Sequence, residues 1–165
     1  MSPDTRFPEG TSDATTAAYF RQGLFAEVFS IEAPKDWAYE MIRLRESPSI
    51  ELIEIATTNQ LREMETLLAR LLPDADLELA ARWLFKDVLQ RLESDEWPLR
   101  RAIRQTMEIA WPIEALERIV WYCDGLIEGI DLAERRTWGE VAEIRRDTID
   151  FLQSECRDRH QEHLR

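Results

Sequence analysis

Residues 77–92 constrain the fold most, because their apolar positions repeat with the period of an α-helix. These positions are Leu77, Ala80, Ala81, Leu84, Phe85, Val88, Leu89 and Leu92, and together they cover one face of a helix. Asp74 or Asp76 can cap the start of this helix, where a negative charge also favours the positive end of the helix dipole. A stripe of this length must be buried against other apolar surfaces. We therefore expect it to form the central helix of an all-α domain.

The remaining chain predicts several shorter helices of the same amphipathic kind. Apolar periodicity occurs in residues 19–29, 34–44, 50–56, 59–72, 98–110 and 112–130, and in a last helix that starts near Asp131 or Thr137 and ends near residue 159. Proline, serine, threonine or asparagine start signals mark the helices from residue 34 to residue 130. Residues 50–56 also alternate like a strand, but their start signal favours a helix. Gly125 and Gly129 leave the end of one helix open, and Trp138 is placed on the inward face of the last one.

The predicted architecture is a single-domain bundle of seven or eight short helices, with mostly antiparallel neighbours. Short loops place helices that are consecutive in sequence next to each other. Trp83, Trp97 and Trp111 recur every 14 residues, but that period is too short for the helix pair of an α-solenoid. We expect a flexible leader at residues 1–15, a helical domain at 16–159 and a frayed tail at 160–165. No apolar run resembles a signal peptide or a membrane span, which predicts a cytoplasmic protein.

The charge is strongly negative and is concentrated in the middle of the chain. The formal net charge is −12, and residues 46–131 contribute −9 of it, from 18 acidic and nine basic residues. Binding to nucleic-acid phosphates or anionic lipids requires basic patches, so this distribution argues against both. An acidic surface suits a basic protein partner. The alternative is that the acidity only keeps the protein soluble.

The residues that usually carry catalysis or bind metals are sparse. Cys123 and Cys156 lie on apolar helix faces, as buried thiols do. Cys156, His160 and His163 could share one helix face, but they lack a fourth metal ligand and a rigid frame. These are the only two histidines, which removes most acid–base and nucleophilic arrangements. We therefore expect no metal, no cofactor and no enzymatic activity.

Acidic residues beside aromatic ones are the candidates for binding a partner. They occur in three places along the chain: Asp74 and Asp76; Glu93, Asp95, Glu96 and Trp97; and Asp124, Glu128 and Asp131, with Trp121 and Tyr122 close by. An exposed tryptophan among carboxylates can act as a binding hot spot. The alternative for Trp97, and equally for Trp111, is a packed position at a helix start.

Four segments resemble small all-helical immunity proteins of bacterial polymorphic toxin systems. They are DWAYEMI, SPSIELIEIA, LARLL and LAARWLFKDVLQRL, within residues 36–130. In that family a tryptophan–alanine pair opens an N-terminal helix and a proline-led apolar helix follows, here at Trp37, Ala38 and Pro48. The resemblance implies a cytosolic antidote that binds and blocks a cognate toxin domain, and a basic toxin would fit the acidic middle segment.

A second function remains open from the sequence. The chain could instead be an acidic helical adaptor or regulatory protein, homodimeric through the aromatic-rich segment at residues 19–29. Both functions require protein binding and neither requires catalysis.

Overall fold

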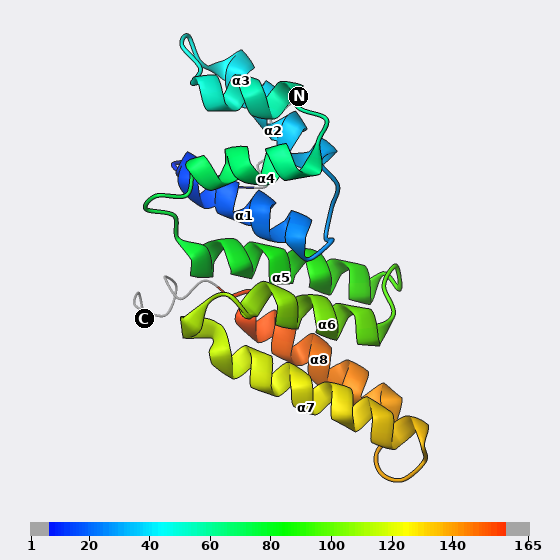
Figure 1. The fold of residues 1–165 in the computed structure, drawn as a ribbon. Coiled ribbons are helices and arrows are strands. Elements are labelled where there is room, and N and C mark those ends of the chain that lie inside the picture. Colours follow the sequence, from blue (N-terminus) through cyan, green and yellow to red (C-terminus); the bar gives the residue numbers. More distant parts are fainter. Residues whose placement is uncertain (1–6, 158–165) are drawn as a thin grey trace. The chain divides into compact units, whose positions relative to one another are not determined.

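A computed structural model describes residues 7–157, and within that range it contains eight α-helices, one short 3-10 helix and no strand (Figure 1). The elements are α1 (Asp13–Phe25), α2 (Glu32–Leu44), α3 (Ile50–Thr57), α4 (Leu61–Arg70), α5 (Leu77–Glu93), α6 (Leu99–Ala110), η1 (Glu114–Leu116), α7 (Glu117–Glu134) and α8 (Val141–Glu155). The predicted all-α helical bundle is confirmed. The ambiguous segment at residues 50–56 is helical, as its start signal indicated.

Within the predicted domain of residues 16–159, the chain forms two compact units, which meet in sequence after Ala80, inside α5. Helix α1 already begins at Asp13, ahead of the expected boundary at residue 16. Residues 1–6 of the expected leader and the expected tail at 160–165 lie outside the described residues. None of the described helices is long and apolar enough to cross a membrane.

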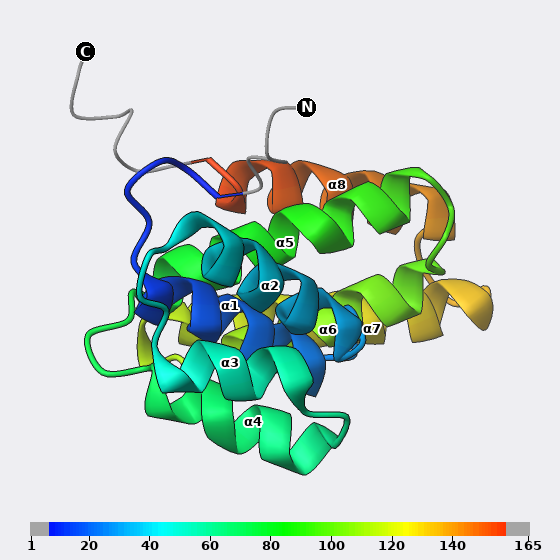
Figure 2. The same cartoon turned by 90° about the horizontal axis from the view of Figure 1, so that it is seen from above.

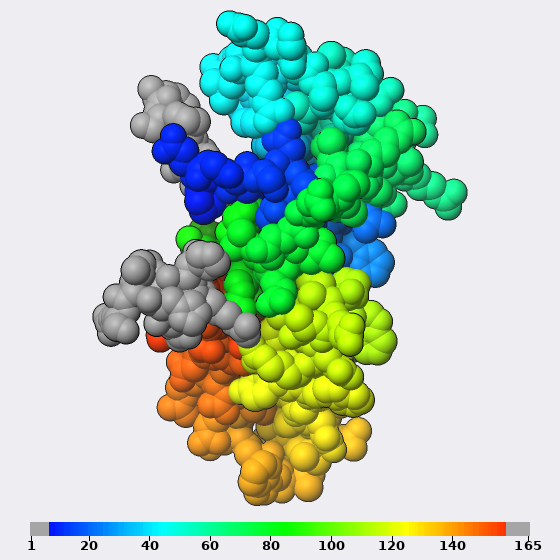
Figure 3. All heavy atoms as spheres, turned by 90° about the vertical axis from the view of Figure 1, so that its left-hand side faces the viewer, coloured from blue at the N-terminus to red at the C-terminus, as the bar shows by residue number. Residues whose placement is uncertain are grey.

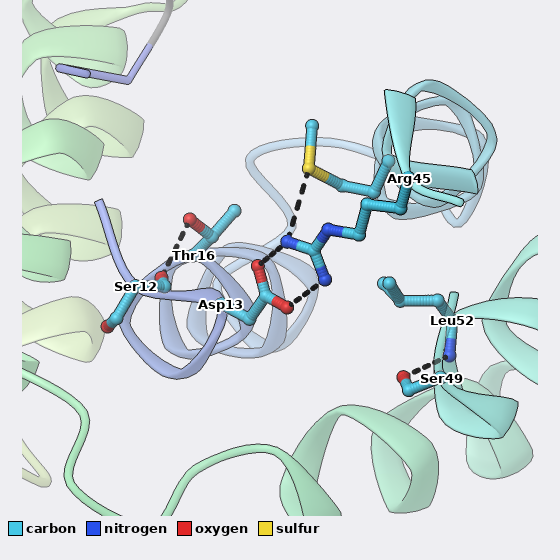
Figure 4. Close-up of polar contacts among 7 residues, drawn as sticks. Ser12, Asp13, Thr16, Arg45, Ser49 and Leu52 are labelled. Carbon is cyan, nitrogen blue, oxygen red and sulfur yellow. Dashed lines mark hydrogen bonds and ion pairs between the residues drawn. The ribbon is translucent and has the colours of Figure 1, made fainter. Parts of the chain in front are cut away.

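In the first unit, α3 packs beside α2 and α4, while α4 also packs on α1 (Figure 2). Polar side chains fix where these helices begin. Ser12 Oγ accepts a hydrogen bond from the Thr15 amide at 3.1 Å, and Ser49 Oγ accepts one from the Leu52 amide at 3.4 Å. Asp13, in the first turn of α1, pairs with both Nη atoms of Arg45 at 2.6 and 2.7 Å (Figure 4). This bidentate pair joins the end of α2 to the start of α1.

Aromatic rings fill the centre of the first unit. Tyr19 lies 5.1 Å from Phe20 and 5.2 Å from Phe29 between ring centroids, and Phe20 lies 5.4 Å from Trp37. Within the segment at residues 19–29, Phe25 is the ring that stays exposed. The aromatic-rich segment therefore packs mainly inside its own unit, which leaves little of it available to a second copy of the chain.

Gly23 provides a test of this packing. A Cβ at Gly23 would lie 2.1 Å from Phe29 Cζ, and the Phe29 ring is held by Tyr19 and Phe20. Alanine favours a helix over glycine by about 1 kcal/mol, but overpacking costs about 1–3 kcal/mol. We expect Gly23→Ala to lower the free energy of unfolding in urea by about 1–2 kcal/mol.

The matched control for Gly23→Ala is Gly125→Ala in α7. Nothing lies within 4 Å of a Cβ built at Gly125, so this variant should gain up to about 1 kcal/mol of stability. Equal stability gains in both variants would show that Phe29 does not fill the space beside Gly23.

In the second unit, α7 packs against α6 and α8 (Figure 1). The predicted apolar stripe of α5 is buried from Ala80 to Leu92, whereas Leu77 at the first position is exposed. Helix α7 continues through Gly125 and Gly129 to Glu134. The prediction for Trp138 is wrong, because α8 begins only at Val141 and leaves Trp138 exposed in the preceding loop.

Buried arginine contacts fasten the C-terminal part of α8. Arg82 Nη1 donates hydrogen bonds to the carbonyl oxygens of Glu155 at 2.9 Å and Arg157 at 3.3 Å. The buried Glu155 carboxylate pairs with Arg118 at 2.8 Å. These contacts supply partners to carbonyl groups at a helix end, which otherwise lack intrahelical donors. The side chain of Arg118 itself remains more than half exposed, and its charge is paired with Glu155.

Candidate functional site

The first predicted acidic pair lies in the loop before α5. Asp76 is exposed, but its Oδ1 accepts a hydrogen bond from the Leu79 amide at 2.9 Å, as an N-cap residue does. Asp74 is also exposed and has a left-handed backbone with φ of 69°. Asp76 therefore has a local role in starting the helix, and Asp74 is an exposed carboxylate for which residues 7–157 supply no ion pair.

The second predicted group runs from Glu93 at the end of α5 into the loop before α6, and its carboxylates contact side chains of the same unit. Asp95 pairs with Arg145 at 3.0 Å, and Glu96 lies 3.8 Å from Arg91. Glu93 Oε1 accepts a hydrogen bond from Gln153 at 3.3 Å. Arg145 also donates to the Leu92 carbonyl oxygen at 2.8 Å, which ties it to the end of α5. Much of the negative charge of this loop is thus matched internally.

Trp97 is a packed residue, as the alternative prediction had it, and it is not an exposed anchor. Only 3% of its surface is accessible. The guanidinium carbons of Arg91 and Arg101 lie 4.8 and 4.5 Å from its ring. Such stacking combines cation–π attraction with burial of the arginine stems. A partner could reach this indole only after those contacts had opened.

The third predicted group lies on α7 and divides into two parts. Asp131 pairs with Arg100 at 2.8 Å, and Glu134 pairs with the same guanidinium at 3.0 Å. The hydrogen bond to Asp131 is the main reason that the pKa of Arg100 is raised. Asp124 and Glu128 are exposed, and no residue between 7 and 157 forms an ion pair with either.

Trp121, which the sequence analysis named only as a neighbour of the third acidic group, is itself a candidate for binding a partner. It is 67% exposed, and its Nε1 donates a hydrogen bond to Glu117 Oε1 at 3.3 Å. We define the α7 outer face by five exposed residues that recur with helical spacing, Glu117, Trp121, Asp124, Gly125 and Glu128. The buried residues of α7, including Ile119, Cys123 and Ile130, lie on the other side. The same spacing could have located this face in the sequence.

The charge of the surrounding segment is nearly all negative. Residues 108–134 contain seven acidic residues and one basic residue, Arg118, which pairs with Glu155. Glu117, Asp124 and Glu128 form no ion pair among the described residues. The α7 outer face therefore presents an exposed indole with carboxylates that no cation of the described chain neutralises. In Figure 3 the yellow atoms around α7 lie on the molecular surface beside the orange atoms of α8.

The titratable groups beside this face are suited to packing. Burial raises the pKa of the Cys123 thiol to about 12, so the thiol stays protonated near neutral pH. Burial, followed by Asp147, raises the pKa of Tyr122, whose ring stacks on Phe151 at 4.3 Å. Burial likewise raises the pKa of Cys156 to about 12. A protonated, buried thiol is a poor nucleophile and a poor metal ligand.

Residues 7–157 contain no group of three or more histidine, cysteine, aspartate or glutamate side chains that could hold a metal ion. Cys156 is half-buried, and His160 and His163 lie outside the described residues.

No family model matches the chain, and no curated protein or solved structure matches it significantly. The resemblance to immunity proteins remains a prediction from the sequence. Function is therefore inferred from the residues on the surface of the molecule.

Proposed function

We propose that this chain is a non-catalytic binding protein that holds a basic segment of another protein on the α7 outer face. One observation carries the proposal: Trp121 is exposed beside Glu117, Asp124 and Glu128, and these carboxylates lack a cationic partner within residues 7–157. Exposed tryptophans are frequent hot spots of protein interfaces. Carboxylates around such a residue attract a basic partner and exclude an acidic one.

The negative charges on this face also repel one another in the free protein. Asp124 and Glu128 are four residues apart, so they are neighbours on the helix surface. A like-charge pair at this spacing destabilises a helix by about 0.2–0.5 kcal/mol. A basic partner would remove this repulsion. Binding surfaces often keep residues that lower the stability of the free protein in this way.

The most specific form of the proposal is a cytoplasmic immunity-type inhibitor that neutralises a basic toxin domain. Its support is the sequence resemblance in residues 36–130 together with the acidity of residues 46–131. Inhibition would require only that the bound chain covers the active site of the toxin. This form needs no catalytic residue in the inhibitor.

The second candidate is an acidic helical adaptor that forms a homodimer. Exposed apolar residues in the first unit favour it. Leu44 is the last residue of α2, and Ile50 and Ile53 lie three residues apart on α3. These residues differ from the aromatic-rich segment that the sequence indicated. Light scattering of the purified chain distinguishes a monomer from a dimer.

Removing two charges from the α7 outer face tests the binding proposal. The probe is a synthetic helical peptide with four arginines on one face, and its association is followed at several salt concentrations. We expect the double variant Asp124→Asn and Glu128→Gln to associate more slowly and to lose part of the salt dependence, because attraction between exposed charges is screened over about 8–10 Å. Its melting temperature should stay the same or rise slightly, since the repulsion within α7 is removed.

The matched control removes two exposed charges elsewhere, by Asp74→Asn and Glu93→Gln. Asparagine tolerates the left-handed backbone of Asp74, so the control should fold normally. It should associate at nearly the wild-type rate. If both double variants slow association equally, only the net charge attracts the peptide, and the acidity serves solubility.

A further inference from the structure

We infer that the α7 outer face takes an arginine side chain of the partner, stacked on the Trp121 indole and paired with Asp124 or Glu128. This inference rests on the proposed function and names the residue by which the partner is recognised. Lysine would supply the same positive charge, so a preference for arginine depends on the shape of the cationic group as well as on its charge.

Gly125 leaves one side of Trp121 uncovered. Side chains on a helix lean toward its N-terminus, so a side chain at position 125 would cover the turn that carries Trp121. Glycine has none, and nothing lies within 4 Å of the place where its Cβ would be. Trp121 itself leans toward Glu117, as the 3.3 Å hydrogen bond from its Nε1 shows. The helix surface between Trp121 and Gly125 is thus open to a side chain from outside.

Two carboxylates border this opening. Asp124 follows Trp121 by three residues, and Glu128 follows Gly125 by three, so both are neighbours of the opening on the helix surface. Both are exposed and have no ion pair within the described range. A cation placed against the indole would therefore lie within reach of a carboxylate.

The available aromatic surface favours a guanidinium over an ammonium group. Methylated ammonium groups are usually enclosed by several rings. Here the neighbouring ring of Tyr122 is stacked on Phe151, so Trp121 offers a single flat surface. A guanidinium can lie flat on one ring and still donate two parallel hydrogen bonds to a carboxylate.

The protein already contains this interaction in its own second unit. Arg91 and Arg101 place their guanidinium carbons 4.8 and 4.5 Å from the ring of Trp97. Trp97 thereby obtains its cations from the chain itself. Trp121 is exposed, and the only basic residue in its segment, Arg118, pairs with Glu155. No arginine stacks on Trp121 within residues 7–157, so we expect a partner to supply the comparable cation.

The test compares two synthetic helical peptides of equal charge, one with four arginines and one with four lysines on the same face. We expect the wild-type protein to bind the arginine peptide about threefold to fivefold more tightly, as one stacked cation at an exposed site would give. Gly125→Gln places a long neutral side chain over the opening. This variant should bind both peptides with the affinity that the wild type shows for the lysine peptide.

Gly125→Ala is the matched control, because it gives a similar gain in helix propensity while adding only a methyl group. It should keep the preference for arginine. Trp121→Leu should remove that preference and retain the weaker binding that depends on Asp124 and Glu128. Circular dichroism and thermal unfolding confirm that each variant is folded.

The outcomes separate this inference from the proposed function. Equal affinity of the wild type for both peptides, with binding still weakened by Asp124→Asn and Glu128→Gln, overturns the arginine inference and leaves the proposed function standing. Binding that is insensitive to every substitution on the α7 outer face overturns both.

Discussion

Replacing Trp97 by alanine is expected to lower the free energy of unfolding by about 3–5 kcal/mol, the usual cost of deleting a buried aromatic side chain. The ring is 3% exposed, and the guanidinium carbons of Arg91 and Arg101 lie 4.8 and 4.5 Å from it. Its loss would leave a cavity and would remove the surface on which both arginines stack. Urea unfolding followed by circular dichroism measures the change.

Trp121→Ala is the control, because it deletes the same side chain from a position that is 67% exposed. Surface substitutions usually change stability by less than about 0.5 kcal/mol. We expect this variant to unfold almost like the wild type while it loses affinity for the arginine peptide. Similar losses of stability in the two variants would contradict the assignment of one tryptophan to the core and the other to the surface.

Leu84→Ala is expected to cost about 2–5 kcal/mol, because the side chain is 0% exposed in the middle of the α5 stripe. Leu77→Ala is the control on the same helix. Leu77 belongs to the same sequence pattern but is 46% exposed, so we expect a loss below about 1 kcal/mol. Equal effects of the two substitutions would mean that burial along α5 is wrongly assigned.

The helices could be predicted from local sequence signals. Periodicity identified the stripe of α5, and α3 begins at Ile50, shortly after the Ser47-Pro48 signal, with Ser49 as its N-cap. The division into two units could not be predicted, because it falls after Ala80 within a continuous apolar stripe. A stripe shows that a face is buried and does not show which elements bury it.

The tryptophans show why surface and core could not be separated by sequence. Trp97 and Trp111 both precede a proline, yet the first is buried and the second is 74% exposed. Arg91 and Arg101 stack on the ring of Trp97, and for Trp111 no equivalent arginine contact is found among the described residues. Such contacts are a property of the folded chain.

The acidic candidates also differ in a way that only the fold reveals, because some are paired with arginines and others are not. Asp95 and Asp131 are matched by Arg145 and Arg100, which lie 50 and 31 residues away in sequence. Asp124 and Glu128 have no such partner within the described part of the chain. Sequence analysis found all of these carboxylates, but only the folded structure shows which of them keep their charge available to a partner.

Fluorine NMR of the protein labelled with fluorotryptophan tests most directly whether the α7 outer face binds a basic segment. The chain has six tryptophans, whose resonances can be assigned by single substitutions. Trp111, Trp121 and Trp138 are all exposed, so each would report a partner that bound beside it. On titration with the arginine peptide, we predict a saturable shift of the Trp121 resonance, with Trp97 unchanged. A saturable shift at Trp111 or Trp138 with none at Trp121 would contradict the proposal.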